Sequence, residues 1–283
     1  MNIINLSPIH KYQIKSIKTG GMGIVYIIHR DENSPLSIDD RIILKSDYLM
    51  DEYKYIYREM LAAKTLKSQE FNEQFVRELN IWINISEKGS VPLLKIIKDN
   101  KMVFGIMPFY NYNLREVLEK GTFSSIKLLS SFKQCIECLK NIYEKYKIIH
   151  LDLKPENILV QVKESDVDLK LSDWVIANLI SDLLLKHEVK ELNSIRTIVG
   201  AGTLPYMAPE RLLMNKPDIQ SDIFSIGMIF YEILFTGLPY NNNFPIEDQL
   251  LSSSYYEIAM QNLWKLKDKN LRNLIVEMLH PYK

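Results

Sequence analysis

Residues 148–160, IIHLDLKPENILV, limit the structure and chemistry of this chain more than any other segment. Asp152 and Lys154 are two positions apart in what we expect to be an extended loop, so both side chains can face one substrate. Asn157 follows immediately before the apolar residues ILV, which predict a short strand. The loop therefore presents an acid, a lysine and an amide together, a set that suits phosphoryl transfer.

A second acid follows in LSDW at 171–174. The run LKLSD predicts another short apolar strand that ends at Asp173. If the two strands pair as a hairpin through the polar turn KESDVD, the Asp173 carboxylate comes to lie beside Asn157. A carboxylate and an amide oxygen form the hard, oxygen-rich kind of site that Mg²⁺ prefers.

These segments resemble the catalytic loop and the metal-binding segment of eukaryotic-type (Hanks-type) serine/threonine protein kinases, in which HRDLxxxxN is followed by DFG. The resemblance covers roughly residues 12–280. It implies an α+β, protein-kinase-like two-lobed fold, with a small β-rich N-lobe that carries a regulatory helix and a larger, mainly helical C-lobe. We place the N-lobe at residues 1–110 and the C-lobe at 111–283 of one catalytic domain.

The same resemblance implies a role for each residue of the two segments. Asp152 would accept or orient the proton of the attacking hydroxyl, and Lys154 would neutralise charge on the transferred phosphoryl group. Asn157 and Asp173 would hold the Mg²⁺ ions that bridge phosphate oxygens of ATP. ATP and Mg²⁺ are therefore the expected cofactors. Each residue alone is a common polar loop residue, but their order along the chain is a specific signal.

Residues 11–30 alternate apolar and polar side chains, which predicts two strands joined by a glycine-rich turn. The turn contains Gly20, Gly21 and Gly23, and glycine lets the backbone approach an anionic phosphate closely. By the resemblance, these glycines and Val25 contact the nucleotide. Alone, such a turn is explained equally well as a plain hairpin.

The next expected strand, RIILK, ends at Lys45, as the lysine strand of the family does. The resemblance assigns Lys45 to the phosphates of the nucleotide. Two glutamates compete as the partner of this lysine. We prefer Glu78, because the run FVREL resembles the family's helix and leads into the apolar strand LLKII. Glu59 would then belong to an inserted or extended helix between residues 47 and 70.

The segment VFGIMPFY predicts a strand that continues into the connection between the lobes. By the resemblance, Met107 borders the adenine, and the backbone of residues 108–110, including Phe109, forms the hinge. An ordinary buried strand would have the same pattern, and the two interpretations are compatible.

The substrate class is indicated by GTLPYMAPERL at 202–212, which resembles the end of the family's activation segment. Residues 205–208 would form a peptide-binding shelf, with Thr203 near the catalytic aspartate. Together with Lys154, which is typical of serine/threonine specificity, the shelf predicts a protein substrate. The helix SDIFSIGMIFYEILFTG resembles the family's central helix, in which Asp222 accepts hydrogen bonds from the catalytic-loop backbone.

Four features depart from the family pattern. Lys18 replaces the first glycine of the phosphate loop. Leu151 replaces the arginine of HRD, which normally binds an activation-loop phosphate, so this non-RD chain is not expected to be controlled by such a phosphate. Val175 replaces the glycine of DFG, and we expect the metal-binding segment to flip less readily. Glu210 lacks the family's arginine partner, unless a basic residue such as Lys283 substitutes.

Composition is that of an ordinary globular enzyme. The 283 residues are 47% hydrophobic and 25% charged, and Lys+Arg and Asp+Glu each total 35. Without a global basic field, we expect no nucleic-acid partner. The N-terminus lacks the apolar segment of a signal peptide, and the apolar run 223–235 contains Glu232 and is too short to span a bilayer. We expect a cytoplasmic protein, and the oligomeric state stays open.

Cys135 and Cys138 form a CxxC motif inside a segment of helical apolar spacing. No second cysteine pair and no histidine at ligand spacing accompanies them, so packing within a helix is favoured over a redox or zinc role.

Two alternative functions are kept beside the kinase. A pseudokinase would use the fold as a binding or scaffold module, but every residue with a direct chemical role is present here. A small-molecule phosphotransferase is disfavoured by GTLPYMAPE, since such enzymes generally lack the peptide-binding shelf.

Overall fold

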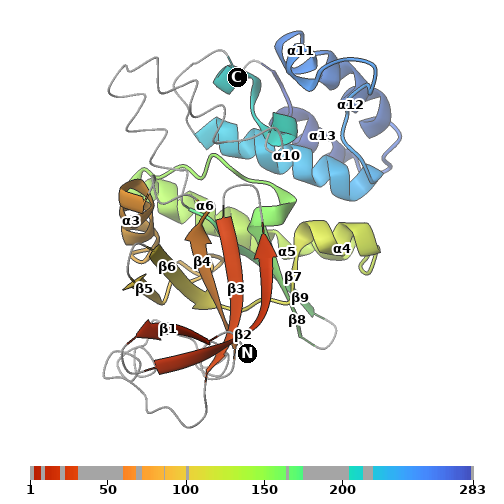
Figure 1. The fold of residues 1–283 in the computed structure, drawn as a ribbon. Coiled ribbons are helices and arrows are strands. Elements are labelled where there is room, and N and C mark those ends of the chain that lie inside the picture. The colour runs from red at the N-terminus through yellow and green to blue at the C-terminus, as the bar shows by residue number, and fades with distance from the viewer. Residues whose placement is uncertain are drawn as a thin grey trace. The chain divides into compact units, whose positions relative to one another are not determined.

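A computed structural model describes residues 3–7, 10–19, 23–30, 60–67, 72–85, 87–99, 102–163, 166–174, 204–212 and 219–281. The chain divides into two compact units, residues 1–111 and 112–283, and each is described by itself. The sequence-based boundary falls one residue earlier, after residue 110. The first unit is mainly a β-sheet, and the second is mainly helical (Figure 1).

The described strands of the first unit form one antiparallel sheet in the order β1-β2-β3-β4-β6-β5 (Figure 1). The strands are β1 (Ile3–Ser7), β2 (His10–Thr19), β3 (Gly23–Arg30), β4 (Met60–Leu66), β5 (Lys95–Asp99) and β6 (Met102–Pro108). The predicted hairpin over residues 11–30 is confirmed, because β2 and β3 pair with Thr19 opposite Ile24. Residues 20–22 of its turn lie outside the described part of the chain.

The central strand β4 corrects one sequence-based expectation. Residues 60–66 were expected within a helix extending over 47–70, but they pair with β3 on one side and β6 on the other. Residues 61–63 and Thr65 are buried, so the strand has the near-continuous apolar run of an element covered on both faces. Alanine, leucine and lysine favour a helix locally, but sheet pairing and burial override that preference. The expected strand at 41–45 lies outside the described residues.

Helix α3 (Asn72–Trp82) is the helix predicted from FVREL, and it packs against the sheet. Its buried face consists of Phe75, Glu78, Leu79 and Trp82. A Cβ added to Gly105 in β6 would lie 2.7 Å from the Leu79 side chain, so only glycine permits this approach of helix and sheet.

The second unit combines a small sheet with helices. The sheet has the order β7-β8-β9, formed by β7 (Tyr112–Asn113), β8 (Ile158–Lys163) and β9 (Asp166–Leu171). Strands β8 and β9 form the predicted hairpin, with Ile158 opposite Leu171. The longer α-helices are α4 (Leu114–Lys120), α5 (Ser125–Ser131), α6 (Lys133–Tyr146), α10 (Ile219–Phe235), α11 (Ile246–Leu251), α12 (Ser254–Leu263) and α13 (Lys269–Met278). The described part of this unit also contains the short helices η2 (Pro155–Asn157), η3 (Leu204–Tyr206) and α9 (Pro209–Leu212).

Helix α10 is the long helix at the centre of the second unit and contacts α5, η3 and α13 (Figure 1). It is buried around most of its circumference, as the apolar run 223–235 predicts. A Cβ on Gly227 would lie 2.8 Å from Met278 Cβ, so α10 and α13 are in close contact. None of the helices in the described part of the chain has the length and apolar character needed to cross a membrane.

The two cysteines pack inside the second unit. Both are buried thiols on α6, and Cys135 Sγ lies 3.4 Å from the carbonyl oxygen of Leu169 in β9. Burial raises the pKa of the Cys135 thiol to about 12, so the reactive thiolate is disfavoured. These contacts agree with the packing interpretation of the CxxC motif.

Candidate active site

The segment 150–157 brings its three polar side chains into direct contact. Lys154 Nζ lies 2.9 Å from Asp152 Oδ2 and 3.1 Å from Oδ1. Asn157 Nδ2 donates hydrogen bonds of 2.8 Å to the backbone oxygen and to Oδ2 of Asp152. Both hydrogens of the Asn157 amide are thus directed to Asp152, and its amide oxygen, the atom a metal ion needs, lies outside these bonds. Asp152 is only 3% exposed, so its carboxylate is held within a small polar cluster.

Asp222 of α10 accepts hydrogen bonds from the backbone of this loop, as predicted. Its two carboxylate oxygens accept backbone hydrogen bonds from His150 (2.7 Å) and Leu151 (2.8 Å). Burial raises the pKa of Asp222, and the electrostatic interaction with His150 and the two backbone hydrogen bonds oppose that effect. His150 Nε2 donates to the Ser172 carbonyl at 2.9 Å, which leaves Nδ1 to accept from the Asp152 N–H at 3.4 Å.

The hairpin of β8 and β9 brings the chain segments that carry Asn157 and Asp173 side by side. The backbone carbonyl oxygen of Asn157 accepts hydrogen bonds from the N–H and the hydroxyl of Ser172, both 2.9 Å long. Asp173 is therefore the next residue after a direct partner of Asn157, as the hairpin prediction requires. Asp173 has φ 68°, a left-handed conformation that aspartate tolerates better than most residues.

The side chain of Trp174 is buried. It is 1% exposed, and its ring centroid is 4.7 Å from that of His150. The sequence-based expectation that this segment holds its metal aspartate inward stays a prediction. Val175 lies outside the described residues.

In the first unit, Gly23 and Val25 belong to β3, and Gly20, Gly21 and Lys45 lie outside the described residues. A Cβ on Gly23 would lie 2.9 Å from the backbone oxygen of Thr65 in β4. The glycine is therefore required for the close approach of two strands, independently of any phosphate.

Sequence reasoning missed a lysine in the sheet. Lys64 of β4 is the register partner of Val25 in β3 and of Gly105 in β6. Its Cε lies 3.5 Å from the position of a Cβ on Gly23, so the end of its side chain is next to the last residue of the glycine-rich turn. The available signal was the tripeptide AAK, which resembles the end of the family's VAIK.

The remaining candidates of the first unit have defined places. Glu78 is buried on the sheet-facing side of α3, one residue before Leu79, which packs over Gly105. Because Gly105 is the register partner of Lys64, α3 crosses the sheet close to that lysine. Met107 is buried in β6, and Phe109 follows the end of that strand. Glu59, the competing glutamate, lies outside the described residues.

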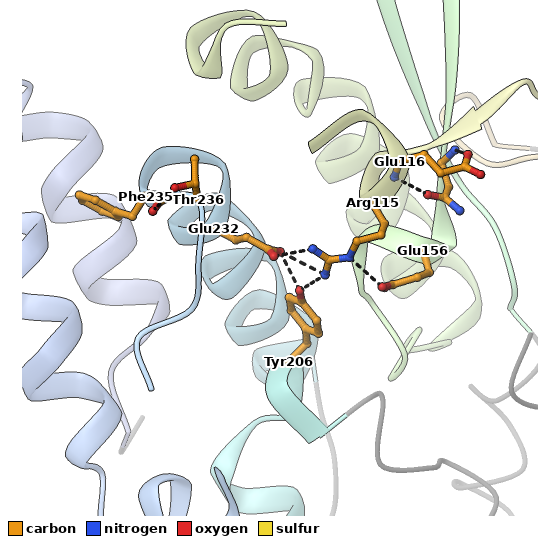
Figure 2. A network of polar contacts seen from close by, with 8 residues as sticks. Arg115, Glu116, Glu156, Tyr206, Glu232, Phe235 and Thr236 are labelled. Atoms are coloured by element: carbon orange, nitrogen blue, oxygen red, sulfur yellow. Dashed lines mark hydrogen bonds and ion pairs between the residues drawn. The ribbon is translucent and has the colours of Figure 1, made fainter. Parts of the chain in front are cut away.

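A polar network connects the predicted shelf to the catalytic loop (Figure 2). Arg115 of α4 donates to Glu156 Oε1 at 2.9 Å, to Glu232 Oε1 at 2.5 Å and to the Tyr206 hydroxyl. The Tyr206 hydroxyl donates to Glu232 Oε2 at 2.6 Å. Burial lowers the pKa of Arg115, but the bonds to Glu232 and Glu156 outweigh it and raise the pKa above its ordinary value. Sequence reasoning did not foresee this network.

Glu210 has a partner within the second unit. The Ser221 hydroxyl at the start of α10 donates to Glu210 Oε1 at 2.8 Å. Glu210, which lacks the family's arginine partner, is therefore hydrogen-bonded to a serine of α10. Lys283, the substitute considered from the sequence, lies outside the described residues. Ser225 further fixes the shelf by donating to the Tyr206 carbonyl at 2.8 Å.

Comparison with known proteins identifies the family. The protein kinase domain family matches residues 51–283, most of the chain, so the chain belongs to this family. Its β-sheet unit and helical unit are those of the two-lobed α+β kinase fold, as predicted. The family match includes Lys64 and Glu78 and begins after Lys45. Members of the family generally use ATP and Mg²⁺.

Several curated relatives are serine/threonine kinases. The chain is 30% identical over 243 residues to serine/threonine-protein kinase PknD of Chlamydia pneumoniae, covering 80% of this chain and 24% of that protein. It is 29% identical over 224 residues to calcium-dependent protein kinase 5 of Plasmodium berghei, covering 77% of this chain and 37% of that protein. The chain thus spans about a quarter of the length of PknD.

Proposed function

We propose that this chain is an active serine/threonine protein kinase, which transfers the γ-phosphoryl group of ATP to a protein hydroxyl. The observation that carries the proposal is the cluster of Asp152, Lys154 and Asn157, in which a buried carboxylate contacts an ammonium group at 2.9 Å and an amide at 2.8 Å. A pseudokinase would not need to retain this arrangement. The kinases among its curated relatives support the same activity.

In this proposal, Asp152 accepts or orients the proton of the acceptor hydroxyl. Its fixed position on a loop held by Asp222 lowers the cost of aligning the hydroxyl for attack. Lys154, already beside the Asp152 carboxylate, neutralises charge on the phosphoryl group as it leaves ATP.

Asn157 and Asp173 are the proposed metal ligands, and their oxygen donors fit Mg²⁺. Among the described residues, no group of three or more His, Cys, Asp and Glu side chains could hold a metal ion. Two protein oxygens completed by phosphates and water are the usual set for this ion. When bound, Mg²⁺ supplies positive charge to the phosphates, and the two side chains provide its place at the end of the β8–β9 hairpin.

For the nucleotide phosphates we propose Lys64 with Glu78 as its partner, in place of Lys45. Lys64 lies beside Gly23 on the strand next to β3, and α3 crosses the sheet at its register partner Gly105. The nucleotide contacts predicted for Gly20, Gly21, Gly23 and Val25, and those predicted for Met107 and Phe109 at the adenine, are part of this proposal.

The proposed substrate is a serine or threonine of a protein. The support is the segment 205–208, whose backbone is tied to α10 by Ser225, together with Lys154 in DLKPEN. Location in the cytoplasm stays a prediction from the N-terminal sequence and the apolar run 223–235, and the absence of a nucleic-acid partner stays a prediction from the balanced charge.

The non-RD character of Leu151 leads us to propose activity without an activation-loop phosphate. Leucine offers no donors to a phosphate, so alanine replacements of Ser194 and Thr197 should each leave the transfer rate close to that of wild type. A large loss on Thr197→Ala, measured with the same acceptor, would contradict this proposal.

The activity is tested with ³²P-labelled ATP, Mg²⁺ and myelin basic protein as acceptor, followed by phosphoamino-acid analysis. Label on serine or threonine, lost in Asp152→Asn, supports the proposal. ATP binding without transfer to any acceptor supports the pseudokinase alternative, and label on a small-molecule acceptor alone supports a small-molecule phosphotransferase.

A further inference from the structure

Leu151, the residue just before the proposed base, has an unusual backbone conformation. Its φ is 62°, in the left-handed region that costs an L-residue conformational energy, and its side chain is 2% exposed. A non-glycine residue keeps such a conformation only where its surroundings impose it. The contacts of the Leu151 backbone therefore determine where Asp152 lies.

The two polar backbone atoms of Leu151 are bound from different elements. Its N–H donates to Asp222 Oδ1 of α10 at 2.8 Å, and its carbonyl oxygen accepts a short hydrogen bond from Arg211 Nη1 of α9. The peptide bond between residues 151 and 152 is planar, so a bond to the carbonyl oxygen also orients the nitrogen of Asp152. That N–H is directed to His150 Nδ1 at 3.4 Å.

Arg211 brings a positive charge to the Leu151 carbonyl, and three carboxylates lie near enough to balance that charge. Burial lowers the pKa of the guanidinium, and the charges of Asp152, Asp222 and Glu210 oppose that effect. Charge-assisted bonds of a guanidinium are stronger and more directional than neutral ones. Arg211 belongs to α9, and this helix begins directly after the predicted shelf of residues 205–208.

We infer that Arg211 is a positioning residue, which holds the catalytic loop through the Leu151 carbonyl and links the place of Asp152 to the peptide-binding shelf. This inference rests on the proposed kinase function. At position 151 itself, the chain has no arginine. Instead, the Arg211 guanidinium of α9 binds the loop, and it does so through the backbone carbonyl of Leu151 and without a phosphate.

The test compares Arg211→Ala and Arg211→Lys with wild type, with Arg272→Ala as the control, an arginine of α13 that stacks on Trp264. We expect Arg211→Ala to lower kcat about tenfold or more, because small displacements of a reacting group are costly. The dissociation constant for a non-hydrolysable ATP analogue should be unchanged. Lysine retains a charged donor, so Arg211→Lys should have an intermediate kcat, and Arg272→Ala should match wild type.

A second readout does not depend on activity. Hydrogen–deuterium exchange should be faster at the amides of residues 150–153 in Arg211→Ala than in wild type, with exchange in α13 unchanged. Wild-type exchange at these amides, or equal loss of kcat and of nucleotide affinity, would overturn the inference. If wild type itself transfers no phosphate, the proposed function fails, and the exchange experiment still decides whether Arg211 positions the loop.

Discussion

Lys64 and Lys45 give a direct test of the nucleotide site at the level of single residues. Lys64→Ala should lower kcat/KM by roughly 10²-fold or more, because the proposed role of this lysine is to stabilise negative charge on the phosphates. Lys45→Ala is the matched control and should retain nearly wild-type kinetics. Measurement of phosphate transfer at varied ATP concentration distinguishes the two. A severe loss for Lys45→Ala with an active Lys64→Ala would restore the original assignment.

Asp222 is the residue whose removal should most damage the catalytic loop. Asp222→Ala leaves the N–H groups of His150 and Leu151 without their acceptor inside the protein, and each buried orphan group is costly. We expect the free energy of unfolding to fall by about 2–4 kcal/mol, with a smaller loss for Asp222→Asn, which keeps one oxygen. Urea denaturation measures both. An unchanged midpoint for Asp222→Ala would show that water replaces the carboxylate.

The cluster of Asp152, Lys154 and Asn157 could be predicted from sequence because its members are close along the chain and their spacing dictates their contact. Lys64 could not be found with the same ease. A lysine after two alanines has the local preference of a helix, and only its pairing with β3 and β6 makes it a strand residue. Arg115 and Arg211 bind groups remote in sequence, so nothing local indicates their partners.

At the scale of elements, α10 and α13 pack closely at Gly227, where there is no room for an added side chain. Gly227→Ala places a methyl group about 2.8 Å from Met278 Cβ. Overpacking costs about 1–3 kcal/mol, which exceeds the gain of about 1 kcal/mol in helix propensity. We therefore expect a net loss of stability in thermal unfolding. Gly237→Ala is the control, because no atom lies within 4 Å of its added Cβ. Equal melting temperatures for the two variants would contradict the tight contact.

Elements with a strong local pattern could be predicted from sequence. The hairpin of β8 and β9 follows from two apolar runs separated by a polar turn, and α10 follows from its long apolar run. Strand β4 could not be predicted, since burial on both of its faces removes the alternation that identifies a strand. The link between Glu210 and Ser221 depends on how α9 and α10 pack, which a sequence pattern does not contain.

At the scale of the whole molecule, the residues named in the proposed function are distributed over the two compact units. Lys64 and Glu78 belong to the first unit, and Asp152 and Asn157 belong to the second. The kinase fold could be predicted because the motifs of both units occur in the family's order along one chain. The departures, Leu151 above all, are single-residue changes that leave that order intact.

The central claim is that this chain catalyses phosphoryl transfer through Asp152, and the rate of transfer from ATP to a protein acceptor tests it most directly. Asp152→Asn should lower kcat by roughly 10²–10⁴-fold, because a positioned base contributes about that much, while the melting temperature stays close to wild type. Asp248→Asn, at an exposed position of α11, is the matched control and should retain the full rate. Wild-type kcat in Asp152→Asn would contradict the account.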